Sequence, residues 1–416
     1  MPKRAVYAIC GVSLTLLIGL AGCSPAEVDT GPEEDAGDTA SAPASIGPMA
    51  QAPASSGPAA AGRGDDAPAY EVDPFWPRPL PNDWILGQVS GIAVDNDDNI
   101  WIIQRPRTLT AHEAGAVQNP PATECCYPAP SVIAFDRAGE VIHAWGGPTW
   151  NQERAEWVEP EDGWPAQEHG IYIDHEDNVW IGGNGQNDHV VLKLNMEGER
   201  LLTIGQWQQT RGSNDAEHLG RPADITVDAE TNEVYIADGY GNRRVIVLDA
   251  DTGEYKRHWG AYGNTPDDSI DISSYDPDAP LESWHSPVHA VKIANDGLVY
   301  VADRAGNRIH VFNKDGSFVM EGLFAAWTIV QGSAWDLEFS RDPEQRWLFV
   351  ADGANMKVWI LRREDLSVAG SFGHGGRQAG QFNWVHNITA DSFGNLYTSE
   401  VNTGKRIQKF VPVAAN

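Results

Sequence analysis

One unit of two short strands joined by a polar turn occurs six times along this chain, and this repeat constrains the fold more than any other feature. Each copy has alternating apolar positions, a turn rich in Asp, Asn and Gly, and a second apolar strand. Further strands follow most copies. Four strands per unit and a period of roughly 40 to 100 residues predict a β-propeller. The copies begin at Ser90, His169, Ala223, His289, Trp335 and His386.

The last copy has only three apparent strands before the chain ends. The segment at residues 70–76, ahead of the first copy, can supply the missing outer strand, which would close the ring and hide a sheet edge. We therefore expect an all-β fold: a six-bladed propeller over residues 70–416, with an N-terminal strand that closes the last blade.

Residues 1–22 have the pattern of an export signal. A short basic start and an apolar run end in Leu20-Ala21-Gly22-Cys23. These four residues resemble a bacterial lipobox, which implies a lipid on Cys23 and anchoring to a membrane, and Ser24 then favours the outer membrane. An ordinary signal peptide or a membrane helix is the alternative. Residues 23–69 are rich in Pro, Ala, Gly, Ser and acidic residues, a composition that predicts a disordered tether. The expected location is the outer membrane, periplasm or cell surface of a bacterium.

The formal net charge of −30 limits the possible partners. Nucleic acids and anionic membrane surfaces require a basic face, so we exclude nucleic acid as a partner. We expect a monomer that binds a small molecule or a peptide. The neighbouring Cys125 and Cys126 could form a disulfide after export, but their redox state stays open.

Three copies share a second signature, in which Ala-Asp is followed by a turn and then by Asn close to Arg or Lys. This signature resembles the NHL repeat. Hydrogen bonding within turns is the structural interpretation of its polar residues. It occurs at Ala237-Asp238 with Asn242, at Ala302-Asp303 with Asn307, and at Ala351-Asp352 with Asn355.

The first residue of the six copies forms one column around the predicted ring. Blades two, four and six carry His169, His289 and His386 in this column, whereas the other blades carry no histidine there. The column begins the innermost strands, beside the central channel, and alternate blades stand about 120° apart. Three protein ligands and an open position are typical of catalytic zinc, so we predict a zinc site on the axis. A lone histidine would be an ordinary polar residue. The remaining nine of the 12 histidines lack register partners and are interpreted mostly as surface or loop residues, and the role of His285, close in sequence to His289, stays open.

The sequence around these histidines resembles that of a known enzyme family. The zinc-histidine segments of peptidylglycine alpha-amidating lyase are similar to three segments here: His169-Gly170-Ile171-Tyr172, Pro287-Val288-His289 and Phe382-Asn383-Trp384-Val385-His386-Asn387. The resemblance covers about residues 85–412. It implies a six-bladed zinc lyase, also called peptidylamidoglycolate lyase. Such an enzyme cleaves the C–N bond of a peptide whose C-terminal glycine is hydroxylated, giving a peptide amide and glyoxylate.

The resemblance also implies roles for three other residues. The family's catalytic tyrosine corresponds to Tyr240, and its active-site arginines correspond to Arg105 and Arg304. A nearby cation such as Arg105 favours phenolate, so that Tyr240 could act as a general base, and Arg304 could bind a substrate carboxylate. The structural alternatives are a turn aromatic for Tyr240 and repeat salt bridges for the arginines.

The sequence departs from the family at three positions. Gly241 replaces a disulfide cysteine, Trp384 replaces a methionine that lines the site, and Asn387 replaces an aspartate that contributes to a structural calcium site. An amide oxygen binds calcium less strongly than a carboxylate does, so calcium is the weaker of the two metal predictions.

Two further functions fit a propeller of this kind. One is a non-catalytic NHL propeller that binds protein or glycan at the cell surface. The other is a lactonase-like hydrolase, a class that resembles this chain in fold but holds a calcium ion with Glu, Asp and Asn. Imidazole ligands at the axis favour zinc over calcium.

Overall fold

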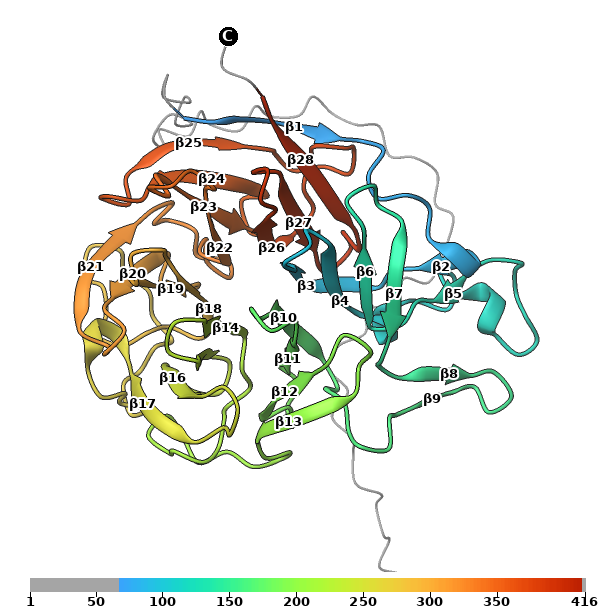
Figure 1. The fold of residues 1–416 in the computed structure, drawn as a ribbon, viewed down its shortest axis with the longest axis horizontal. Helices are drawn as coiled ribbons and strands as arrows, with labels where there is room; N and C mark the ends of the chain where they lie inside the picture. The colour runs from blue at the N-terminus through green and yellow to red at the C-terminus, as the bar shows by residue number, and fades with distance from the viewer. Residues whose placement is uncertain (1–66, 414–416) are drawn as a thin grey trace, which may run out of the picture. The chain divides into compact units, whose positions relative to one another are not determined.

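The computed structural model describes residues 67–413. The predicted signal peptide, the lipidation site Cys23 and residues 23–66 of the tether lie outside the described residues. Within residues 67–413 the chain forms six four-stranded antiparallel sheets and two two-stranded sheets. The six larger sheets are the blades of a propeller arranged around a central axis (Figure 1). The predicted all-β, six-bladed fold is therefore confirmed.

Each blade is built outward from its innermost strand. Blade 1 contains β3 (Gln88–Val94), β4 (Ile100–Arg105), β6 (Val132–Phe135) and β7 (Val141–Trp145). Blade 2 contains β10 (Glu168–Ile173), β11 (Val179–Gly183), β12 (Val190–Leu194) and β13 (Arg200–Gly205). Blade 3 contains β14 (Asp224–Asp228), β15 (Glu233–Asp238), β16 (Arg244–Asp249) and β17 (Tyr255–Trp259).

The second half of the ring repeats this plan. Blade 4 contains β18 (Val288–Ile293), β19 (Val299–Asp303), β20 (Arg308–Phe312) and β21 (Phe318–Leu323). Blade 5 contains β22 (Asp336–Phe339), β23 (Trp347–Asp352), β24 (Lys357–Arg362) and β25 (Val368–Phe372). Blade 6 contains β26 (Val385–Ala390), β27 (Leu396–Glu400), β28 (Ile407–Val413) and, as its outer strand, β1 (Ala69–Asp73).

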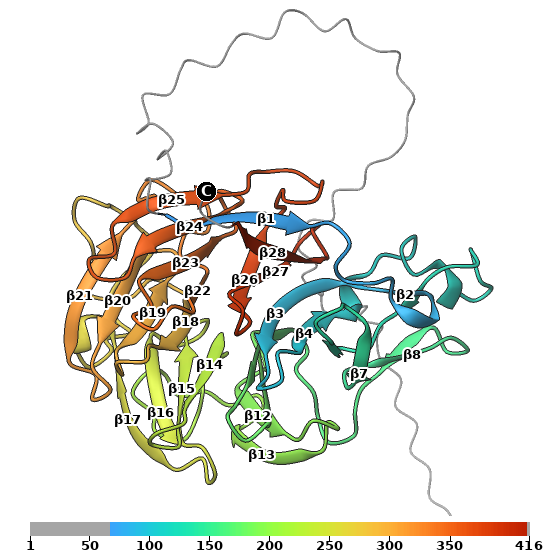
Figure 2. The ribbon, with the colours of Figure 1, turned by 45° about the horizontal axis from the view of Figure 1, so that its top comes forward.

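The outer strand of blade 6 comes from the N-terminal side of the described chain, as predicted. β1 pairs with β28 in antiparallel register from Ala69 opposite Val413 to Asp73 opposite Lys409. Figure 2 shows β1 lying along the edge of this last blade. Because the two ends of the described chain share one sheet, the ring closes through backbone hydrogen bonds and leaves fewer exposed edges.

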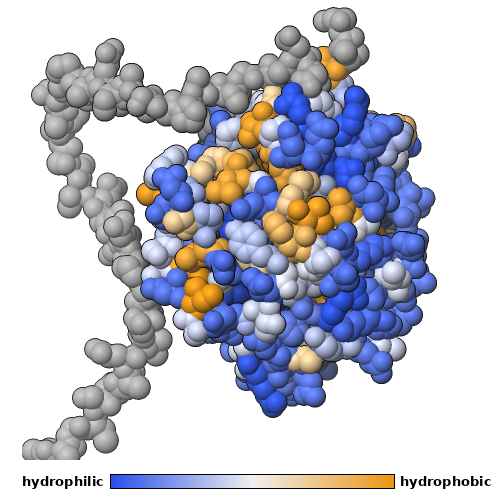
Figure 3. Space-filling model, turned by 90° about the vertical axis from the view of Figure 1, so that its left-hand side faces the viewer, coloured by the Kyte–Doolittle hydropathy of each residue, from blue (hydrophilic) through white to orange (hydrophobic). Residues whose placement is uncertain are grey.

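Apolar side chains fill the spaces between neighbouring blades. One cluster joins Tyr235 and Val247 of blade 3 to Val291 and Val301 of blade 4, all of them buried. Polar turns set the hairpin registers: the Asp174 carboxylate, for example, accepts hydrogen bonds from the Asn178 backbone and from Trp180 Nε1, both at 2.8 Å. The outer surface is mainly hydrophilic with separate apolar patches on the side drawn in Figure 3.

Smaller elements decorate the blades. β2 (Trp84–Ile85) pairs in parallel with β5 (Tyr127–Pro128), and β8 (Thr149–Asn151) forms a hairpin with β9 (Glu156–Val158). None of the helices within residues 67–413 has the length and hydropathy of a membrane span. The four helices in this range are short 3₁₀ turns: η1 (Pro81–Asp83), η2 (Pro106–Thr108), η3 (Gly115–Val117) and η4 (Ala261–Gly263).

Candidate metal centre

The three histidines of the sequence column meet on the axis. His169, His289 and His386 are each the second residue of an innermost strand, β10, β18 and β26, and at most 3% of each is exposed. Their ring centroids lie 4.8–4.9 Å apart in all three pairs. One potential ligand atom from each ring lies within 4.8 Å of the other two. Three buried histidines in a nearly equilateral arrangement could hold a metal ion.

A local irregularity in each strand positions these side chains. The register between the first two strands of the blade shifts where the chain passes His169, His289 and His386. Such bulges turn a side chain out of the regular alternation and are frequent beside functional sites. The residue after His169 must be glycine, because a Cβ on Gly170 would lie 2.7 Å from the carbonyl oxygen of Ala223.

Neighbouring oxygen atoms orient the imidazoles, and for two of them these are backbone carbonyls of odd-numbered blades. Nδ1 of His169 lies 2.7 Å from the carbonyl oxygen of Ala223. Nδ1 of His289 makes the equivalent hydrogen bond to the carbonyl oxygen of Trp335, and Nδ1 of His386 faces Oδ1 of Asn387. Ala223 and Trp335 are the column residues of the blades that follow those of His169 and His289. A proton on Nδ1 leaves Nε2 as the ligand atom. The hydrogen bond at Nδ1 thus fixes the tautomer and the ring orientation that metal binding requires.

Burial keeps all three rings neutral. Desolvation lowers the pKa of His169 and His289 well below the usual value, and lowers the pKa of His386 to about 3. The neighbouring positive charges of Arg105 and Arg304 act in the same direction. Neutral imidazole is the form that binds a metal, so the triad is ready for one at neutral pH.

Tyr240 brings its hydroxyl group to this centre. It lies in the turn after β15, and its hydroxyl oxygen is 2.9 Å from Nε2 of His169 and 3.2 Å from Nε2 of His289. The turn can pass so near blade 4 because Gly239 has no side chain: a Cβ there would lie 2.0 Å from the Val288 carbonyl oxygen. The sequence-predicted tyrosine is therefore in contact with two of the three histidines.

Arg304 completes the contact group. It follows β19, and its Nη1 donates to the Tyr240 hydroxyl at 3.1 Å. Its guanidinium carbon lies 4.5 Å from the centroid of the Trp335 ring, a cation–π arrangement that fixes the side chain. Within residues 67–413, the buried Nε of Arg304 has no hydrogen-bond partner. This unused donor suits an anionic ligand.

Arg105 is close to the centre, but its donors are committed to protein groups. It ends β4 and is buried, and its Nε donates to the carbonyl oxygen of Glu168 at 2.6 Å. Its other nitrogens donate to the side chains of Gln88 at 3.1 Å and Asn184 at 3.2 Å. Burial lowers the pKa of Arg105, opposed by nearby Tyr240 and Glu168. The geometry makes Arg105 a support for the strand that carries His169.

The surroundings of Asn387 do not fit a calcium ion. Its Oδ1 faces Nδ1 of His386, and its Nδ2 donates to Asp336 at 3.1 Å. A second carboxylate, that of Asp224, lies 3.0 Å from Nζ of Lys292. An ammonium group therefore already occupies the layer of buried carboxylates beside Asn387. Sequence reasoning missed this cluster, although Asp224 and Asp336 both stand one position after the histidine column.

Other expectations have mixed outcomes. The surface or loop interpretation is wrong for His310, which lies fully buried on β20 between Trp284 and Glu321.

The open question on the adjacent cysteines is answered by a disulfide between Cys125 and Cys126. Trp384 is half-buried beside the centre, with its ring 5.9 Å from that of Trp335.

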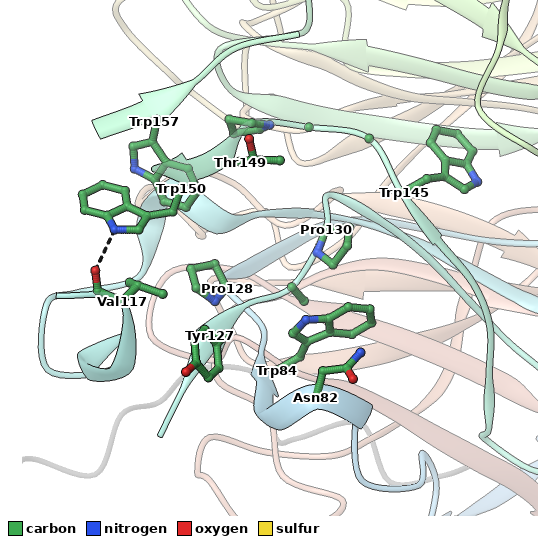
Figure 4. A pocket seen from close by; sticks show the side chains of 14 residues that line it. Asn82, Trp84, Val117, Tyr127, Pro128, Pro130, Trp145, Thr149, Trp150 and Trp157 are labelled. Atoms are coloured by element: carbon green, nitrogen blue, oxygen red, sulfur yellow. Dashed lines mark hydrogen bonds between the residues drawn. The ribbon is translucent and has the colours of Figure 1, made fainter. Parts of the chain in front are cut away.

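A pocket lies away from the histidines, among loops beside blade 1. This aromatic pocket has a volume of about 650 Å³, and none of its lining residues is charged. Figure 4 shows Trp84 and Tyr127 on one side and Trp150 and Trp157 on the other. The hairpin that carries the latter pair is tied down by a hydrogen bond from Trp150 Nε1 to Val117.

Fold and site together define an NHL-repeat six-bladed propeller with a candidate metal centre on its axis. No protein-family model matches the sequence. The chain is 25% identical over 367 residues to NHL repeat-containing protein 3 of Mus musculus, covering 83% of this chain and 85% of that protein. It is 23% identical over 241 residues to a probable peptidyl-alpha-hydroxyglycine alpha-amidating lyase of Caenorhabditis elegans, covering 55% of this chain and 56% of that one. The solved structure of a streptogramin B lyase aligns with 79% of this chain and with 94% of its own chain. The TM-score is 0.45 and the sequence identity is 14%.

Proposed function

We propose that this chain is a zinc-dependent lyase that cleaves the C–N bond of a peptidyl-alpha-hydroxyglycine, or a related hydroxylated compound, to an amide and glyoxylate. One observation carries the proposal: the Tyr240 hydroxyl contacts two of three converging neutral imidazoles and also contacts Arg304. The distant similarity to an amidating lyase supports the same reaction class.

The donor set fits zinc. Three imidazole nitrogens with an open position match its preference, whereas calcium prefers six to eight oxygen ligands. His169, His289 and His386 would hold the ion. When bound, zinc supplies Lewis-acid polarisation of a substrate hydroxyl group and lowers the pKa of that hydroxyl.

The chain's own residues then handle one proton and one carboxylate. Tyr240 takes the proton from the substrate hydroxyl, a carbonyl forms, and the C–N bond breaks with its electron pair going to nitrogen. Tyr240 returns the proton to that nitrogen, so no water and no redox partner are consumed. Arg304 holds the carboxylate of the glyoxylate moiety through its free donors. Arg105 keeps β10 and His169 in position through its hydrogen bond to the Glu168 carbonyl oxygen.

The predicted export signal and Cys23 would place this activity on the outer side of a bacterial cell membrane, as a lipid-anchored protein. Its partners would then be external peptides with a hydroxylated C-terminal glycine. This location remains part of the proposal and calls for its own measurement: labelling of Cys23 by a fatty-acid analogue, with Cys23→Ala as the unlabelled control.

The decisive experiment combines elemental analysis of the full-length protein with a glyoxylate assay on a peptidyl-alpha-hydroxyglycine. We expect one zinc ion per chain and glyoxylate release well above the buffer rate. A zinc-loaded protein that releases no glyoxylate above that rate would exclude this reaction.

The aromatic pocket favours a second candidate, a non-catalytic propeller that binds protein or glycan. Uncharged aromatic faces such as those of Trp84 and Tyr127 suit sugar rings or proline-rich peptides. A protein that holds no metal, shows no activity with added zinc, and loses glycan or peptide binding on Trp84→Ala would favour this reading over the lyase.

A further inference from the structure

A buried charge cluster joins three blades next to the metal centre. Lys292, three residues after His289 on β18, points its Nζ at Asp224 Oδ2, 3.0 Å away, and at Asp336 Oδ1, 3.6 Å away. The aspartate side chains are 3% and 1% exposed and that of Lys292 is 18% exposed. Two carboxylates this deeply buried require a cation, because an unpaired buried charge is strongly destabilising.

The cluster reaches a metal-binding candidate through hydrogen bonds. Asp336 Oδ2 accepts from Asn387 Nδ2 at 3.1 Å and from the backbone of Ile388 at 2.9 Å. The other end of the same amide, Asn387 Oδ1, faces Nδ1 of His386. A continuous chain therefore runs from Lys292 through Asp336 and Asn387 to His386.

We propose that Lys292 is the built-in cation of this layer, replacing the structural calcium ion that the family resemblance implies, and that it positions His386 through Asp336 and Asn387. A calcium ion needs six to eight oxygen ligands at about 2.3–2.6 Å. Here the ammonium group lies within hydrogen-bond reach of one carboxylate and close to the second, and the amide oxygen of Asn387 serves His386. A tethered cation cannot dissociate, so the centre stays organised when calcium is absent.

The inference concerns the scaffold and does not depend on the reaction proposed above. Its consequences appear in thermal stability and calcium content, which need no substrate. Failure of glyoxylate release would leave it intact, and its own failure would leave the lyase proposal intact.

The first experiment compares the zinc-loaded full-length wild type in calcium chloride and in calcium-free buffer, with the same zinc concentration in both. We expect the same melting temperature in both solutions and no calcium in the purified protein by elemental analysis. One bound calcium ion per chain, together with a lower melting temperature in the calcium-free buffer, would overturn the proposal.

The second experiment separates charge from packing. Lys292→Met keeps the length of the side chain and removes its charge, and we expect its melting temperature to fall by about 5 °C or more. Lys292→Arg keeps the charge and should stay near the wild type. The matched control is Lys256→Ser, because Lys256 pairs with Asp249 at 3.2 Å on the partly exposed outer strand β17 and its loss should change little. Wild-type stability in Lys292→Met would overturn the proposal.

A double variant keeps the test decisive if Lys292→Met folds poorly. Asp336→Asn removes one of the two carboxylates, so Lys292→Met combined with Asp336→Asn should be more stable than the sum of the single losses predicts. Strict additivity would contradict the pairing. For the positioning of His386, we expect zinc affinity in Lys292→Met to fall about tenfold in a chelator competition, and to recover in Lys292→Arg. An unchanged zinc affinity would refute that part.

Discussion

Nδ1 of His169 lies 2.7 Å from the carbonyl oxygen of Ala223, the residue that begins the next blade's innermost strand region. His289 and Trp335 repeat this relationship two blades further on. Blades 3 and 5, which carry no column histidine, therefore orient two imidazoles with their backbone carbonyls. This alternation gives His169 and His289 each a carbonyl acceptor on the neighbouring blade, which leaves Nε2 free to bind a metal.

Removing one histidine should remove the metal. In His289→Ala two ligands remain, and we expect zinc affinity to fall by about 100-fold or more, measured by chelator competition with elemental analysis. Chelation should also lower the melting temperature of the wild type, because bound metal stabilises the folded state. His175→Ala, in an exposed turn, is the matched control and should bind zinc as the wild type does. Equal zinc affinity in His289→Ala would rule out the axial site.

Tyr240→Phe removes one oxygen atom and keeps the ring that packs beside His169. Because the hydroxyl is the proposed carrier of the proton, kcat should fall by about 10²- to 10⁴-fold while zinc content stays at one per chain. Tyr255→Phe removes an exposed hydroxyl on blade 3 and should leave turnover unchanged. Undiminished kcat in Tyr240→Phe would exclude this residue from proton transfer.

Arg304→Gln should impair only substrates that carry a carboxylate. Loss of a charged hydrogen-bonding partner corresponds to about 3 kcal/mol, so kcat/KM should drop about 100-fold for the free acid. The matching methyl ester offers no carboxylate and should react at similar rates with both proteins. Arg346→Gln, at an exposed pair with Asp342, is the control. A similar loss for acid and ester would mean that Arg304 acts in some other way.

A pH effect is expected at Asp352 of blade 5. Burial raises the pKa of its carboxyl group to about 6, although Trp359 and Asn355 donate hydrogen bonds to it. The folded state thus binds this proton more tightly than the unfolded chain does. The stability contributed by the protonated group is complete below about pH 4 and is lost as pH rises through about 6, by about 2 to 3 kcal/mol.

Urea midpoints at pH 4.5 and 7.5 test this sign. Relative to Asp352→Asn, the wild type should be more stable at pH 4.5 than at pH 7.5. Asp303 of blade 4 provides the contrast: burial acts to raise its pKa, but the paired Arg308 and the neighbouring His285 together outweigh burial and lower it. The difference in urea midpoint between the wild type and Asp303→Asn should therefore be the same at pH 4.5 and at pH 7.5. Matching slopes for the two variants would contradict the assignment.

Much of the fold and part of the site could be predicted from the sequence. Strand alternation and turn residues identified six blades, and the shortage of one strand in the last copy led to residues 70–76. Register within the repeat brought His169, His289 and His386 into one column. Family resemblance was needed to single out Tyr240 and Arg304, because neither stands out by spacing.

By itself, then, the sequence determined the blade number, the closing strand and the residues of the axial column, since these follow from periodicity along the chain. The tertiary structure alone decided which groups support the column, such as the carbonyl of Ala223 for His169 and Lys292 between Asp224 and Asp336. It also decided that His310 is buried. The physical reason is distance along the chain. Periodicity specifies the face on which a side chain lies, whereas its partner comes from another blade, 54 residues away for His169 and Ala223, and only packing of the closed ring brings the two together.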